Sequence, residues 1–121
     1  MTGAASQASA FYRDVARNRK LWTIRDASGY PAPMGTGGKR AHPFWSSLPR
    51  VEKVVASVPA YAGFVPDEIS WERFCSAWLP GLKRDGLLIG LNWSGARATG
   101  YDLEPDELLR NVESLMENAR S

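Results

Sequence analysis

The stretch Leu87–Trp93 constrains the fold more than any other, because it is apolar on both faces of a strand. A strand with one face in water alternates apolar and polar residues, whereas a strand covered on both faces carries a continuous apolar run. We therefore expect residues 87–93 to form a central strand with other elements packed on either side. The chain has 121 residues, which is long enough for one such core and predicts a single domain over residues 1–121.

Several further stretches have apolar residues at the spacing of an α-helix. These predicted helices cover residues 6–20, residues 48–57, residues 71–79 and the end of the chain from Pro105. Ser70 is in position to cap the third helix, and Pro80-Gly81 is expected to kink or end it. One face of that helix collects four side chains that we expect to be buried: Trp71, Phe74, Cys75 and Trp78.

The remaining stretches predict strands and loops. We expect a strand at 21–25, an edge strand at 30–33, a short strand at 43–46 and extended chain at 61–69. The order of elements predicts an α+β fold, with a mixed or antiparallel sheet of about four to five short strands covered by about four helices. The small and polar residues 1–10 are expected to include a disordered N-terminal tail.

A single cysteine, Cys75, and a single histidine, His42, exclude most familiar catalytic and metal sites. An intramolecular disulfide, a zinc site with several cysteines and any site that needs two histidines are all ruled out. The stretch Gly35–Lys39 is not a Walker loop, because Pro33 stands where that motif needs glycine and Arg40 where it needs Ser or Thr. We therefore expect no enzyme activity, no cofactor and no metal, with Cys75 an inert core residue.

The charges are divided unevenly along the chain. Residues 1–53 carry nine basic and three acidic side chains, whereas residues 54–121 carry six and ten. We expect the two halves to neutralise each other in the fold. The basic half carries no recognised nucleic-acid-binding motif, so we do not expect nucleic acid as the partner. The N-terminus has no signal-peptide pattern and no apolar run approaches membrane-spanning length, so we expect a cytoplasmic protein without membrane contact.

Two glycine-containing loops, Gly35–His42 and Asn92–Arg97, hold the candidate ligand-binding residues. The first loop is basic, and the second follows the predicted central strand, at the end of a strand where ligand sites often form. The candidate residues are Lys39, Arg40 and His42 in the first loop, and Asn92, Trp93, Ser94 and Arg97 in the second.

The run from Trp78 to Ser94 resembles an uncharacterised bacterial family known as domain of unknown function 2750. The stretches Phe44-Trp45-Ser46-Ser47 and Trp22-Thr23-Ile24-Arg25 add to the resemblance, which covers about residues 11–105. The resemblance implies a small bacterial cytoplasmic domain. It implies no activity and assigns no functional residue.

Two functions fit these observations. The first is a non-catalytic module that binds another protein, in a regulatory or toxin-neutralising role, and it is favoured by the small size, the five tryptophans and the divided charge. The alternative is a domain that binds a small ligand or anion through the loops Gly35–His42 and Asn92–Arg97.

Overall fold

The structure is a computed structural model of the chain, and it describes residues 4–33, 38–95 and 99–120. The helices are α1 (Ala4–Asn18), α2 (Leu48–Ser57), α3 (Trp71–Arg73), α4 (Leu79–Arg84) and α5 (Pro105–Arg120), with a 3₁₀ turn η1 (Pro59–Tyr61) and a π-helical turn η2 (Phe74–Trp78). The strands are β1 (Lys20–Arg25), β2 (Ala41–Phe44), β3 (Val65–Ser70), β4 (Leu88–Ser94) and β5 (Thr99–Leu103). The predicted α+β class is confirmed.

The strands in the described chain form two sheets that meet edge to edge. Strand β1 pairs antiparallel with β3, while β4 lies between β2, its parallel neighbour, and β5, its antiparallel neighbour. A single bridge between Trp22 and Trp45 joins the sheets. The prediction that residues 87–93 form a central strand is therefore confirmed.

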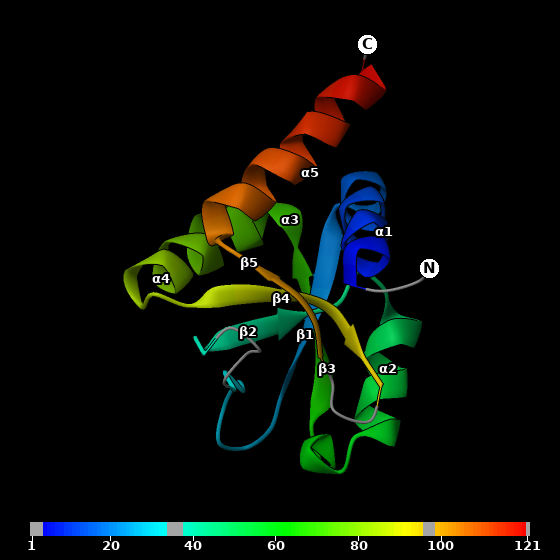
Figure 1. Cartoon of the computed structure of the whole chain (residues 1–121), viewed down its shortest axis with the longest axis vertical. Helices are drawn as coiled ribbons and strands as arrows, with labels where there is room; N and C mark the ends of the chain where they lie inside the picture. Colours follow the sequence, from blue (N-terminus) through cyan, green and yellow to red (C-terminus); the bar gives the residue numbers. More distant parts are fainter. Residues whose placement is uncertain (1–3, 34–37, 96–98, 121) are drawn as a thin grey trace.

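Side chains on the two faces of β4 enter two separate cores. Ile89 and Leu91 pack in the larger core, together with side chains of α1, α4 and α5. Trp93 packs in the smaller core, where it meets Val51 and Val54 of α2. Figure 1 shows α5 at the top, α1 at the upper right and α2 apart from both, at the lower right. Both faces of the strand are covered, as its apolar sequence requires.

Pro43 explains why the sheets meet at only one bridge. A proline has no N–H to donate, so β2 cannot continue an antiparallel ladder with β1 beyond Trp45. The hydroxyl of Thr23 on β1 instead donates to the Pro43 carbonyl oxygen of β2, at 2.9 Å. The same hydroxyl oxygen lies 2.9 Å from Nε2 of His42 and, having used its proton, accepts from that nitrogen. A side-chain hydrogen bond thus links the two strands at the residue that cannot donate a backbone one.

Two expectations for the first third of the chain are wrong. Helix α1 begins at Ala4 and buries Ala8, so most of residues 1–10 are helical rather than a tail. Residues 30–33 form no strand, because two prolines remove donors and the ring of Tyr30 packs on the larger core's aromatic side chains instead.

Two expectations later in the chain need correction as well. The sequence predicts no strand between residue 93 and the last helix, but Thr99–Leu103 form strand β5, which pairs with β4 across a bulge between Leu91 and Ser94. The sequence pattern of this strand is weak because it contains Gly100, and glycine is unfavourable in strand interiors. The predicted extended stretch 61–69 becomes a strand only at Val65, after the turn η1.

The helix that begins at Trp71 does not stop at Pro80-Gly81. Ser70 caps it as predicted, since its Oγ accepts from the N–H of Arg73 at 3.1 Å. The chain then widens into η2, where the N–H of Leu79 bonds to the carbonyl oxygen of Phe74, five residues back. This π-helical turn shifts the hydrogen-bond register just before Pro80, so the helix continues into α4.

The indole of Trp93 lies directly over Gly90 on β4. A Cβ at Gly90 would overlap the Cε2, Cζ2 and Nε1 atoms of that ring, and one at Gly100 of β5 would lie 3.0 Å from Cδ1. The indole N–H donates to Oδ1 of Asp102 at 2.8 Å. Two glycines on neighbouring strands therefore make the space in which this tryptophan is held.

We expect Thr23→Val to lower the free energy of unfolding by about 2–4 kcal/mol. Valine keeps the shape but leaves the buried Pro43 carbonyl and the His42 N–H without a partner. Urea unfolding measures the loss. Thr23→Ser keeps the hydroxyl and is the control, with an expected loss of about 1 kcal/mol for the methyl group. Equal losses in both variants would contradict the role given to the hydroxyl.

We expect Gly90→Ala to destabilise the protein by about 1–3 kcal/mol, because the new methyl group overlaps the Trp93 indole. The near-ultraviolet circular dichroism of the tryptophans is expected to change with it. Gly81→Ala in α4 is the control. Its nearest contact would be 3.6 Å, and alanine suits a helix, so we expect it to stabilise by about 0.5–1 kcal/mol. A neutral Gly90→Ala would disprove this packing.

Candidate functional site

The end of β4 forms one wall of a groove that reaches α2 and α1. The groove has a volume of about 600 Å³ and includes three of the predicted residues, Asn92, Trp93 and Ser94. Gln7 of α1 lines it as well, and α2 supplies the opposite wall. We call it the α2–β4 groove, and its lining in α2 consists of Pro49, Arg50, Lys53, Val54 and Ser57.

One face of α2 points two cationic side chains into the groove. Arg50 and Lys53 are three residues apart, so they lie next to each other on the helix surface. Both are exposed, and neither has an ion-pair partner among the residues that the structure describes. Glu52 falls on a different face of the helix and is not part of the lining. The described lining of the groove is therefore positively charged.

Asn92 supports the base of the groove from an unusual backbone position. It has a φ of 50° within a strand and is 1% exposed. Asparagine tolerates this left-handed conformation better than most residues, and the bulge in β4 provides the place for it. Its Oδ1 accepts from the N–H of Ser46 at 2.9 Å, and its Nδ2 donates to the Gln7 carbonyl oxygen at 3.2 Å. Asn92 thus joins β4, α1 and the start of α2.

Hydroxyl groups extend this polar network on both sides of Asn92. The Ser46 hydroxyl donates to Oδ2 of Asp14 at 2.7 Å and accepts from Nδ2 of Asn92 at 3.1 Å. At the groove surface, Nε2 of Gln7 donates to Oγ of Ser94. Because Ser94 accepts in that bond, its own proton stays available to donate to a ligand.

The other predicted residues lie elsewhere. Nζ of Lys39 is 3.8 Å from Oε1 of Glu104, and Nη1 of Arg40 donates to the Ala32 carbonyl oxygen at 3.2 Å. These contacts connect the described part of the first loop to Glu104 and Ala32. Arg97 lies outside the described residues. The structure therefore brings together only Asn92, Trp93 and Ser94 of the predicted set.

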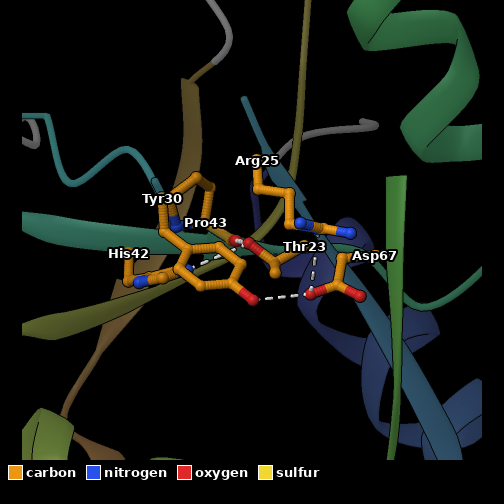
Figure 2. Close-up of polar contacts among 6 residues, drawn as sticks. All are labelled: Thr23, Arg25, Tyr30, His42, Pro43 and Asp67. Atoms are coloured by element: carbon orange, nitrogen blue, oxygen red, sulfur yellow. Dashed lines mark hydrogen bonds and ion pairs between the residues drawn. The ribbon is translucent and has the colours of Figure 1, made fainter. Parts of the chain in front are cut away.

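His42 is buried rather than placed in a loop. The residue is 5% exposed, and its ring stacks on Phe44 at 4.6 Å between centroids and makes an edge contact with Trp78 at 5.3 Å. Figure 2 shows Tyr30 lying over His42, with the Tyr30 hydroxyl bonded to Asp67 at 2.7 Å. Burial lowers the pKa of His42 from 6.5 to about 4. The imidazole is thus a neutral part of the core, with Thr23 as its hydrogen-bond partner.

Cys75 and Trp78 are half-buried at the edge of the larger core, whereas Trp71 and Phe74 are buried as predicted. Burial raises the pKa of the Cys75 thiol to about 11, with Glu113 and Glu72 adding to the effect. A thiol with this pKa is not a nucleophile at neutral pH. In the described chain, Cys75 has no hydrogen bond to His42.

The sequence did not predict the part of the groove that α1 and α2 supply, which includes the polar residues Gln7, Arg50 and Lys53. The one available signal is that the cations of α2 share a face while Glu52 occupies another. That signal does not identify the opposite wall, which comes from a strand about forty residues later in the chain. Within the described residues there is no cluster of side chains suited to hold a metal ion, and no helix is long and apolar enough to cross a membrane.

Fold and groove together define a small α+β domain with an open, cationic cleft beside its central strand. The sequence profile of one family, described as "protein of unknown function (DUF2750)", matches residues 8–112. The chain belongs to this family. No curated protein matches it.

His42 makes stability depend on pH. Its pKa is about 4 in the folded protein and 6.5 when unfolded, so between these values the unfolded chain binds the extra proton. The stabilisation is complete above pH 6.5, and we expect about 3 kcal/mol of it to be lost as the pH falls to 4. Urea unfolding at pH 7 and pH 4 measures this.

His42→Gln is the control for this prediction, because its amide is neutral at every pH and keeps a donor near Thr23. Since His42 is the chain's one histidine, no other imidazole titrates in the same range. We expect the loss of stability between pH 7 and pH 4 to be smaller by about 3 kcal/mol in the variant. The same loss in both proteins would mean that carboxylates alone cause it.

Proposed function

We propose that the protein is a non-catalytic binding module that holds a small organic anion in the α2–β4 groove. The observation that carries the proposal is the pair Arg50 and Lys53, which line this groove without an ion-pair partner in the described chain. Because the described lining holds no carboxylate that competes for them, both cations remain available to pair with an anion. The proposal adopts the second of the two functions expected from the sequence and moves its cationic side from the loops to α2.

The groove also has a surface for the organic part of such a ligand. Val54 and Trp93 are apolar and lie at the inner side of the groove, but each is only 3% exposed. Pro49 adds an exposed ring beside Arg50. Small-molecule sites combine apolar surface with polar groups that fix the orientation of the ligand. The volume of about 600 Å³ is within the usual range for such sites.

The groups that line the groove favour binding over catalysis. They are cations, amides and hydroxyls, which hold an anion by charge and hydrogen bonds. The two groups with the largest pKa shifts, His42 and Cys75, belong to the other face of the sheet. Our proposal places the protein in the cytoplasm, because a free thiol such as Cys75 suits a reducing compartment.

A protein partner is the second candidate, favoured by Leu48 at the start of α2, which is 39% exposed beside the groove lining. The other large exposed apolar side chains in the described chain, Tyr30 and Val65, belong to separate segments. Interfaces usually need a contiguous apolar patch. A small anion therefore explains the groove better than a protein does.

We test the proposal with Arg50→Gln/Lys53→Gln. A panel of organic carboxylates and phosphates is screened for stabilisation of the folded protein by thermal denaturation. A ligand at one hundred times its Kd stabilises the native state by about 2.7 kcal/mol. We expect at least one compound to reach this in the unmodified protein and none to do so in the double variant.

Two control variants make the same change of charge elsewhere. Arg13→Gln/Arg17→Gln alters α1 outside the groove, and Lys39→Gln/Arg40→Gln alters the first predicted loop. We expect both to respond to the ligand as the unmodified protein does. Loss of binding in the loop variant alone would move the site to the loop, and a panel without any stabilising compound would contradict the proposal.

A further inference from the structure

We infer that the ligand of the α2–β4 groove is an organic phosphate monoester bound as its dianion, rather than a carboxylate or another singly charged anion. This inference rests on the proposed function and names the chemical class of its ligand. It follows from three features of the groove: the number of cations, the number of hydrogen-bond donors, and the space beside them.

The two cations match a doubly charged group. Side chains three residues apart on a helix start from Cβ atoms about 5–6 Å apart, so Arg50 and Lys53, which line the same groove, are close enough to contact one anion together. The described lining includes no Asp or Glu to offset either charge. A carboxylate neutralises one of the two cations, whereas a phosphate monoester at neutral pH carries close to two negative charges.

The donors of the groove are also more numerous than a carboxylate needs. The Arg50 guanidinium offers a fork of N–H groups, Lys53 offers an ammonium and Ser94 offers a hydroxyl proton. A carboxylate has two oxygens to accept these bonds, while a phosphate monoester has three terminal oxygens. The tetrahedral phosphate points its oxygens in three directions, so it can accept hydrogen bonds from α2 and from β4 at the same time. The planar carboxylate has fewer directions in which to accept them.

The first turn of α2 adds to this end of the groove. Ser47 makes no capping hydrogen bond with its side chain, so no side-chain oxygen occupies the start of the helix. Pro49 and Arg50, which line the groove, belong to that first turn. The partial positive charge at the start of the helix therefore adds to the attraction that Arg50 and Lys53 exert on an anion.

The remaining space selects an ester over inorganic phosphate. A groove of about 600 Å³ is far larger than one phosphate group needs, and the exposed ring of Pro49 gives it apolar surface beside Arg50. An organic group attached to the phosphate removes this apolar surface from water. Inorganic phosphate leaves it exposed.

Calorimetry with four probes tests the inference: phenyl phosphate, phenyl sulfate, benzoate and inorganic phosphate. Phenyl sulfate has the tetrahedral shape of the phosphate but a single negative charge. The difference in Kd between phenyl phosphate and phenyl sulfate therefore measures the effect of the second charge. At pH 7.5 we expect phenyl phosphate to bind at least tenfold more tightly than each of the others. At pH 5 the phosphate, with a second pKa near 6, is mostly a monoanion, and its Kd is expected to rise about tenfold.

The same change of pH does not alter the charge of the control ligand or of His42. Phenyl sulfate keeps its charge, and His42 stays neutral because its pKa is about 4, so we expect the Kd of phenyl sulfate to be the same at pH 7.5 and pH 5. In Lys53→Gln one cation is left, and the preference for phosphate over sulfate is expected to disappear. Lys53 is exposed, so an unchanged thermal midpoint verifies that the variant is folded.

The outcomes separate this inference from the proposed function. If benzoate or phenyl sulfate binds as tightly as phenyl phosphate, and all lose affinity in Arg50→Gln/Lys53→Gln, the groove binds anions but the dianion inference is wrong. If no probe binds, both are wrong. Binding of phenyl phosphate that is unchanged in Lys53→Gln also overturns the inference.

Discussion

Trp45 connects the two sheets to each other and to the groove. Its backbone exchanges hydrogen bonds of 2.7 and 2.8 Å with Trp22, which holds β1 and β3 against the other strands. Its indole N–H donates to the carbonyl oxygen of Trp93 at 2.8 Å, beside the lining of the groove. Helix α2 begins three residues later. The position of the groove therefore depends on the same residue that holds the sheets together, and Thr23 reinforces that junction where Pro43 cannot.

Elements defined by their own local pattern were predictable, and elements defined by distant partners were not. Helix α2 and strand β4 have clear apolar periodicity or a continuous apolar run, and both were found within one residue of their ends. Strand β5 was missed because Gly100, which breaks its pattern, is small in order to leave room for Trp93. In η2 the hydrogen bonds shift to a partner five residues back, which lets the helix continue through Pro80. No residue pattern in the sequence indicates this shift.

The same distinction applies to the candidate site. The end of the central strand could be recognised as a binding region, since ligand sites often form at strand ends, and Asn92, Trp93 and Ser94 do line the groove. The cations across from them belong to α2, and no local pattern relates α2 to that strand end. His42 was misjudged for a similar reason, because Tyr30 and Trp78, the rings that bury it, are distant in sequence.

The separation of the apolar residues into two cores has a consequence for cooperativity. Helix α2 packs on the smaller core, while α1, α4 and α5 share the larger one, so local opening of α2 leaves most buried contacts intact. Amide hydrogens of α2 then exchange with solvent through a partial opening of low free energy, whereas those of β4 exchange only when the whole domain unfolds. A molecule that touches α2 and β4 together suppresses the partial opening, so occupancy of the groove is recorded in the exchange rates of a single helix.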